Sequence, residues 1–179
     1  MKKFEERTIQ STPIFSGHVV SLKVDEVELP NGQVGKREII NHPGAVAIIA
    51  ITDEGKMIVV EQYRKALERS IVEIPAGKLE RGEEPSVTAR RELAEETGLD
   101  CKELVPIQSF ATSPGFADEV IHLFVARGLF PCEQPAYLDD DEFLELLEVT
   151  VEEAEEMVQR GIIYDAKTAF AVLWLKMNS

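Results

Sequence analysis

The sequence is poor in cysteine, in positive charge and in long apolar runs. It has two cysteines, Cys101 and Cys132, with neither a CxxC nor a Cys-His spacing, and we interpret both as reduced thiols. Lys and Arg number 19 against 33 Asp and Glu, which gives a formal net charge of −14. A chain this acidic repels phosphate backbones, so we expect no nucleic-acid partner. Clustered carboxylates suit hard divalent cations instead.

The longest apolar run, residues 45–51, is far too short to span a bilayer. The first residues carry positive charge without the apolar stretch of a signal peptide. We therefore expect a cytoplasmic protein with no membrane partner. Hydrophobic residues make up 44% of the 179, enough for the core of one globular domain with a small extension.

Strand patterns dominate the first half of the chain. Alternating apolar residues in 19–29 and 33–41 flank a turn at residues 30–32 and predict a small N-terminal β unit. Residues 45–52 and 57–63 predict a second hairpin, and 70–74 a short strand. Further strands are expected at 104–110, 120–126 and 143–149, with a long acidic loop over 127–142.

Three helices are expected between and after these strands, so the pattern predicts a mixed α/β domain. The first has Pro85 in its first turn and Gly98 as its C-terminal cap. Thr150 begins a capping box for a second helix, which ends at Gly161. Asp165 caps a third, which runs through Trp174.

The first helix carries three closely spaced acids. At about 100° per residue, Glu92, Glu95 and Glu96 fall within an arc of about 100°. Val87 and Leu93 lie on the opposite side, so we expect that side to be buried and the acids to face outward. Carboxylates this close repel each other, and a bound Mg²⁺ would reverse the effect. A solvated acidic helix face is the alternative.

Gly77 and Gly82 precede this helix in a loop, where the backbone turns sharply or approaches a ligand. Together, residues 77–99 resemble the Nudix box: Gly, five residues, Glu, seven residues, then Arg-Glu-apolar-any-Glu-Glu-any-Gly-apolar. The matching residues are Gly77, Glu83, Arg91, Glu92, Leu93, Glu95, Glu96, Gly98 and Leu99.

The resemblance extends to the ADP-ribose pyrophosphatase branch of that family. Glu61-Gln62-Tyr63-Arg64 and the run from Glu73 to Leu79 are similar to it, and Pro114 follows Gly98 by sixteen residues, as the branch requires. Pro114 as a simple turn residue is the alternative. The resemblance implies an α/β/α sandwich of Nudix type with a mixed sheet. It would comprise an N-terminal β extension (1–42) and a hydrolase domain (43–179).

The resemblance also implies a metal site. Glu92, Glu96 and the backbone carbonyl of Ala76 would bind Mg²⁺, with Mn²⁺ able to substitute, and Glu95 would complete the site and share in catalysis. Glu83 would support the metal site from the loop, and Arg91 would pair with a carboxylate of the box and hold the loop to the helix.

The expected substrate is a nucleoside-diphosphate sugar bound by a homodimer. Arg64 would grip the diphosphate, because a guanidinium offers two parallel donors to phosphate oxygens. Glu73 and Pro114 would also contact the substrate. The N-terminal strands would reach the partner's site, and adenine would lie near Phe15 and Arg37.

By resemblance, the reaction is hydrolysis of ADP-ribose to AMP and ribose 5-phosphate. Another nucleoside-diphosphate sugar such as GDP-mannose, or NADH, is the alternative within the same enzyme class. A Nudix-fold sensor that binds ADP-ribose without cutting it is the alternative outside that class. The intact set of three box glutamates argues against the sensor, which has no need of them.

The general base is expected on the acidic loop that ends at residues 138–142, outside the box. We favour Glu142 and keep Asp140 as the alternative, because a run of adjacent acids does not indicate which of them is the base. A solvated loop explains these acids equally well.

Glu142→Gln should lower kcat by roughly 10²–10⁴-fold, as for loss of a general base. Metal affinity should change little, and the measurement is steady-state hydrolysis at saturating Mg²⁺. Should Asp140→Asn show this loss while Glu142→Gln keeps full activity, the base is Asp140.

Overall fold

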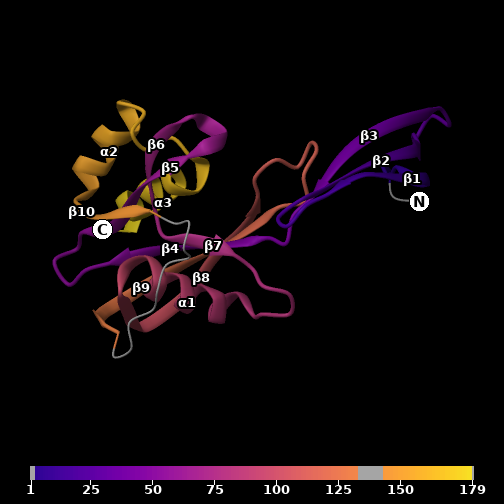
Figure 1. Cartoon of the computed structure of the whole chain (residues 1–179). Coiled ribbons are helices and arrows are strands. Elements are labelled where there is room, and N and C mark those ends of the chain that lie inside the picture. Colours follow the sequence, from indigo (N-terminus) through magenta and orange to yellow (C-terminus); the bar gives the residue numbers. More distant parts are fainter. Residues whose placement is uncertain (1–2, 133–142, 179) are drawn as a thin grey trace. The chain divides into compact units, whose positions relative to one another are not determined.

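A computed structural model describes residues 3–132 and 143–178, which divide into two compact units (Figure 1). The first unit comprises Met1–Gly44 and Ala111–Val120. The second comprises Ala45–Phe110 and Ile121–Ser179. The first unit therefore includes a segment that lies far along the chain from the N-terminal β extension.

The first unit contains an antiparallel sheet of β1 (Arg7–Ser16), β2 (Ser21–Glu28) and β3 (Val34–Asn41), in that order. The hairpin expected around residues 30–32 is confirmed as β2 and β3, and Gly32 supplies the positive φ of the turn. Strand β1 was not predicted. Each of its residues is exposed, and its register with β2 shifts at two points. Without a buried face, its sequence has no regular alternation of apolar and polar residues.

The segment 111–120 forms a turn that is bonded to the end of β3. Ile40 N donates to Phe116 O at 2.8 Å. The carboxylate of Asp118 accepts from the side chain of Asn41 (2.7 Å) and from His42 N (2.8 Å). These bonds, that from Asn41 first, lower the pKa of Asp118. The turn that carries Pro114 is thereby tied to the N-terminal sheet.

In the second unit, seven strands of the described chain form one mixed sheet in the order β10-β5-β4-β9-β8, with β6 beside β5 and β7 beside β4. Strand β4 runs parallel to β9 and antiparallel to β5 and β7. The strands are β4 (Ala45–Ile51), β5 (Met57–Arg64), β6 (Arg69–Glu73), β7 (Ala76–Lys78), β8 (Leu99–Ala111), β9 (Val120–Pro131) and β10 (Leu144–Val149), with a 3₁₀ turn at Lys65–Leu67.

Helices cover both faces of this sheet. Helix α1 (Pro85–Thr97) lies on one face, and α2 (Val151–Gln159) and α3 (Ala166–Asn178) lie on the other (Figure 1). The expected α/β/α sandwich is confirmed.

Strand β4 shows why the run at residues 45–51 is apolar throughout. Val46 and Ile48 pack with Leu93 of α1, whereas Ala47 and Ile49 belong to the core beneath α2 and α3. A strand buried on both faces has no polar side to alternate with. The helices on the two sides thus share one central strand.

Three boundaries differ from expectation. Strand β9 continues to Pro131, so the loop expected from residue 127 is wrong for 127–131; residues 133–142 lie outside the described residues. Strand β8 begins at Leu99, directly after α1. The last helix continues past Trp174 to Asn178. Apart from the buried Cys101 and Leu175, the residues of the added pieces are exposed or partly exposed, so burial leaves little apolar pattern in their sequence.

The two expected N-terminal caps are present. Thr150 Oγ1 accepts from Glu153 N at 3.2 Å, and the Glu153 carboxylate accepts from Thr150 N at 2.8 Å, which confirms the capping box of α2. Asp165 Oδ1 accepts from Thr168 N at 3.1 Å at the start of α3. Within residues 3–132 and 143–178, no helix is long and apolar enough to cross a membrane.

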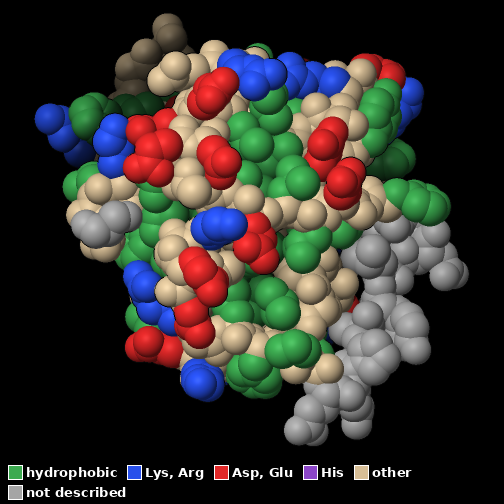
Figure 2. Space-filling model, turned by 90° about the vertical axis from the view of Figure 1, so that its left-hand side faces the viewer, with side chains coloured by type: hydrophobic (Ala, Val, Ile, Leu, Met, Phe, Trp, Pro, Cys, Tyr) green, Lys and Arg blue, Asp and Glu red, His purple; other side chains and the backbone are tan. Residues whose placement is uncertain are grey.

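Charged side chains of both signs lie among apolar ones on the face shown in Figure 2. On that face, the negative charge of the chain is not gathered into one patch.

Candidate functional site

The Nudix-like run folds as strand β7, a loop and helix α1. The loop turns at Gly82, whose φ is 82°, and Pro85 occupies the start of the helix. Gly98 ends it in the left-handed region, with its N–H bonded to Ala94 O at 2.9 Å. The glycines and proline of the sequence thus set where the helix begins and ends.

Glu92 and Glu96 are buried, with 8% and 5% of their surfaces exposed. The expectation that the acids of α1 face outward is therefore wrong for these two, and Val87, expected inside, is 55% exposed. The stripe of residues 88, 92 and 96 lies beside the apolar stripe of Ala89 and Leu93 on the helix, and both stripes pack inward.

Gly77 makes the burial of Glu92 possible. A Cβ at residue 77 would lie 1.8 Å from the carboxyl carbon of Glu92, far inside any contact distance. The φ of Gly77 is not positive, so its role is close approach, and the sharp turn belongs to Gly82. Next to it, Ala76 N donates to Glu96 Oε2 at 3.1 Å. Both buried carboxylates therefore lie against the backbone of β7.

Arg91 lies among the other acids of the box. Its guanidinium contacts Glu92 Oε1 (2.9 Å), Glu95 Oε2 (2.8 Å) and Glu83 Oε2 (3.3 Å). Burial lowers the pKa of Arg91, but these three carboxylates outweigh it and raise the pKa overall. The hydrogen bonds from Arg91 and Thr88 lower the pKa of Glu83. Arg91 thereby holds the loop to the helix.

The donor chemistry fits a hard divalent cation. The buried oxygens come from carboxylates that lie against the backbone of β7, and hard cations take such oxygens in preference to nitrogen or sulfur. Among residues 3–132 and 143–178, no three His, Cys, Asp or Glu side chains are grouped as a metal site. Arg91 contacts both Glu92 and Glu95, so burial separates the candidates: Glu92 and Glu96 are buried beside Ala76, whereas Glu95 is more exposed.

A second charged cluster lies at the end of β6. Glu73 is 2% exposed, and its carboxylate accepts from Arg64 Nε (2.5 Å), from Arg64 Nη2 (3.1 Å) and from Lys167 Nζ. Lys167 also donates to Asp165 Oδ1 at 3.0 Å. Burial lowers the pKa of Arg64, but the carboxylate of Glu73 and the charges of Glu96 and Asp165 raise it overall. Arg64 thus lies within electrostatic range of a box glutamate.

Comparison with known families identifies the family to which these residues point. The NUDIX domain family matches residues 41–168. The chain belongs to the Nudix family. A second family, described as the nucleoside diphosphate sugar hydrolase N-terminal domain, matches residues 6–40.

Three similar proteins cover almost the whole chain. It is 62% identical over 177 residues to the methanol dehydrogenase activator of Bacillus methanolicus, covering 99% of this chain and 96% of that protein. It is 58% identical over 178 residues to the ADP-ribose pyrophosphatase of Bacillus subtilis (strain 168), with the same coverage. A solved structure of an ADP compounds hydrolase has a TM-score of 0.85 at 20% identity, covering 100% of this chain and 99% of that one, and shares the Nudix fold.

The remaining candidates fall into two groups. Arg64, Glu73 and the box residues are in the second unit, whereas Phe15, Arg37 and Pro114 are in the first. Arg37 pairs with Glu6 through Nε (2.8 Å) and Nη2 (2.5 Å). Glu142 and Asp140 lie outside the described residues.

Sequence reasoning missed Lys167, which is 9% exposed, and Thr88, which bonds Glu83. The sequence signal available for Lys167 was that it is the one charged residue in the first half of α3.

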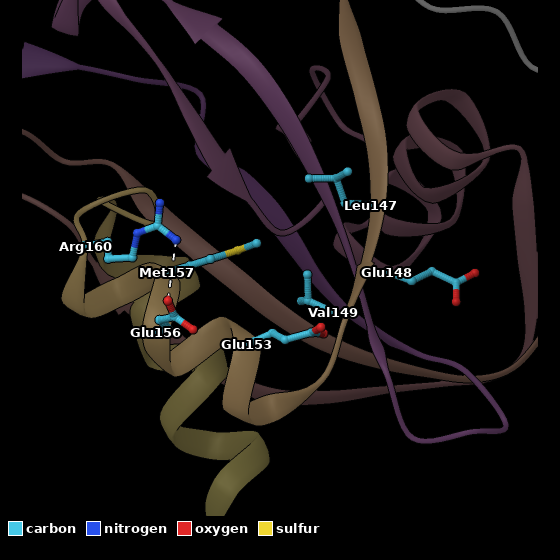
Figure 3. A pocket seen from close by; sticks show the side chains of 7 residues that line it. All are labelled: Leu147, Glu148, Val149, Glu153, Glu156, Met157 and Arg160. Atoms are coloured by element: carbon cyan, nitrogen blue, oxygen red, sulfur yellow. Dashed lines mark hydrogen bonds and ion pairs between the residues drawn. The ribbon is translucent and has the colours of Figure 1, made fainter.

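A hollow of about 340 Å³ between β10 and α2 is unrelated to this Nudix site (Figure 3). Met157 points from α2 toward β10, and Arg160 Nη1 lies 3.5 Å from Glu156 Oε1 beside it. None of its lining residues is a candidate site residue; they are Leu147, Glu148, Val149, Glu153, Glu156, Met157 and Arg160.

Gly77→Ala should separate metal binding from folding in this Nudix site. The new Cβ would displace the end of a flexible side chain, the Glu92 carboxylate, so we expect a small change in melting temperature. Losing a ligand from its place should weaken Mn²⁺ binding at least roughly tenfold, about 1.4 kcal/mol, as followed by electron paramagnetic resonance.

Gly115→Ala is the matched control, because outside residues 114–116 no atom lies within 4 Å of the point that its new methyl group would occupy, and its φ is not positive. Wild-type Mn²⁺ affinity in the Gly77→Ala protein would show that Glu92 holds no metal.

Proposed function

We propose that this chain hydrolyses ADP-ribose to AMP and ribose 5-phosphate, using Mg²⁺, with Mn²⁺ able to substitute. The observation that carries the proposal is the pair of buried box glutamates, Glu92 and Glu96, placed against β7 beside a diphosphate-gripping candidate, Arg64. The 58% identity with an ADP-ribose pyrophosphatase over nearly the whole chain supports this choice among Nudix substrates.

The residues divide the work by their chemistry. Glu92, Glu96 and the carbonyl of Ala76 would hold the cation, which lowers the pKa of a water and offsets charge on the diphosphate. Arg64 donates to a phosphate oxygen through Nη1, because its hydrogen bonds to Glu73 use Nε and Nη2. Glu95 pairs with Arg91 and supports the box. Glu142, or alternatively Asp140, takes the proton from the water.

Two alternatives remain weaker. A ligand sensor of the same fold would not need two adjacent carboxylates buried at the cost of part of their hydration. GDP-mannose and NADH differ from ADP-ribose in the groups that flank the diphosphate. Pro114, whose φ is restricted, stiffens the turn between β8 and β9 and favours a compact sugar phosphate over a nicotinamide group.

We also propose a homodimer formed through the N-terminal sheet. All ten residues of β1 are exposed, and among the described residues this strand pairs with β2 alone. Ile9, Ile14 and Phe15 are each more than half exposed. An edge strand that exposes large apolar side chains is suited to cover by another chain. In the dimer, Phe15 and Arg37 would contact adenine in the partner's site.

A second candidate function is suggested by the 62% identity with a protein named methanol dehydrogenase activator. The chain would then activate a methanol dehydrogenase. Adding the wild-type chain and the Gly77→Ala protein separately to a methanol dehydrogenase tests this, with the dehydrogenase rate as the readout. An unchanged rate with both proteins would exclude it for that dehydrogenase.

ADP-ribose should be preferred over GDP-mannose, NADH and nucleoside triphosphates by at least roughly tenfold in kcat/KM, about 1.4 kcal/mol of transition-state discrimination. Equal concentrations of the four compete in one reaction, and AMP, GMP and nicotinamide mononucleotide are separated and quantified. Chelation of the metal should abolish every product. A mixture dominated by GMP or nicotinamide mononucleotide would refute ADP-ribose as the substrate.

The double variant Ile9→Lys/Ile14→Lys should convert the dimer to a monomer, because two buried charges oppose pairing along β1. Light scattering coupled to size exclusion gives the mass. Val158→Lys, an exposed apolar position on α2, is the control and should stay dimeric. A wild-type chain that is monomeric at all concentrations would contradict the dimer itself.

A further inference from the structure

We propose that Lys167 and Asp165, at the start of α3, are positioning residues for Arg64. Lys167 holds the Glu73 carboxylate, and Glu73 in turn holds the guanidinium that grips the diphosphate. The inference rests on the proposed function, because it concerns the residue assigned there to the diphosphate. Its basis is the chain of contacts from Asp165 through Lys167 and Glu73 to Arg64.

The geometry at Arg64 leaves one edge of the guanidinium for an anion. Nε and Nη2 form the side edge and donate to the two oxygens of Glu73, at 2.5 and 3.1 Å. Among the described residues, Nη1 donates no hydrogen bond, and 41% of the side chain is exposed. A planar guanidinium fixed along one edge has its other edge fixed as well. Glu73 therefore sets the direction from which a phosphate can be gripped.

Glu73 cannot hold this geometry alone. A single carboxylate can rotate about its last bond, and Arg64 is a long, flexible side chain. Lys167 Nζ is bonded to the same Glu73 oxygen, Oε2, that accepts from Arg64 Nη2, and Lys167 is itself 9% exposed. A buried cation on that oxygen prevents the rotation, so Arg64 loses less freedom when a ligand binds.

Asp165 fixes Lys167 and balances its charge. Its Oδ1 accepts from Lys167 Nζ at 3.0 Å and from Thr168 N at 3.1 Å, so the carboxylate is anchored to the first turn of α3. Thr168 Oγ1 also accepts from Ile74 N at 3.0 Å, which ties this turn to the residue after Glu73. Two carboxylates and two cations together form a neutral cluster, and each member keeps a partner of opposite charge.

A double-mutant cycle on ligand affinity tests the proposal. The ligand is the non-hydrolysable α,β-methylene analogue of ADP-ribose, titrated calorimetrically with Mg²⁺ into full-length protein. Lys167→Met should weaken binding about tenfold, about 1.4 kcal/mol, and Arg64→Met by more. In the Arg64→Met background, Lys167→Met should cause no further loss, because its effect passes through Arg64.

Conservative and control variants separate positioning from folding. Lys167→Arg restores a donor to Glu73 and should recover most of the affinity. Asp165→Asn keeps the helix-capping oxygen and removes the charge that holds Lys167, and it should weaken binding in the wild-type background alone. It serves in place of Lys167→Met if that protein does not fold. Lys176→Met, on the same helix but 58% exposed, should bind the analogue like wild type. Mn²⁺ affinity should match that of wild type in the Lys167 and Asp165 variants.

Losses that add in the double variants would overturn the positioning role, as would wild-type affinity in both Lys167→Met and Asp165→Asn. A wild-type protein that binds no diphosphate ligand would instead overturn the proposed function from which the inference starts.

Discussion

Two carboxylates of helix α1 are buried against the backbone of strand β7, and the box around them is arranged so that this burial is tolerated. An ionised carboxylate removed from water costs several kcal/mol unless it is paired or hydrogen-bonded. The backbone N–H of Ala76 donates a hydrogen bond to Glu96, and Arg91 forms an ion pair with Glu92. Gly77 supplies the space, because any side chain there would overlap the carboxylate of Glu92. The excess negative charge that remains is what a divalent cation would offset.

The five residues 73–77 connect this site to both layers of the sandwich. This segment runs from the last residue of β6 to the middle of β7, and its central carbonyl, Pro75 O, accepts from Ile48 N of β4 at 2.8 Å. Helix α3 contacts its first two residues and α1 its last two, through the pairs Glu73 and Lys167, Ile74 and Thr168, Ala76 and Glu96, and Gly77 and Glu92. Helices on opposite faces of the sheet thereby meet at one short segment, which contacts both the candidate diphosphate-binding residue Arg64 and the candidate metal ligands Glu92 and Glu96.

The first unit has a different physical character. Its sheet has few buried side chains, among them Val27 and Asp25, and β1 has none. A three-stranded sheet of this kind has little core of its own, and stability then depends on what covers it. Its exposed apolar side chains are the observation behind the proposed pairing with a second copy of the chain.

The sequence by itself determined the family, the box and the order of most elements, because these depend on local residue patterns. Pro85 and Gly98 bounded α1, and the capping box at Thr150 bounded α2, through bonds between residues close in the chain. Only the tertiary structure decided which side of α1 is buried. Glu92 and Glu96 look like a solvent face by composition, and the space that buries them comes from a glycine on a different element. Lys167 gave no comparable signal, since its partner Glu73 lies 94 residues away and proximity in the fold alone brings the two charges together.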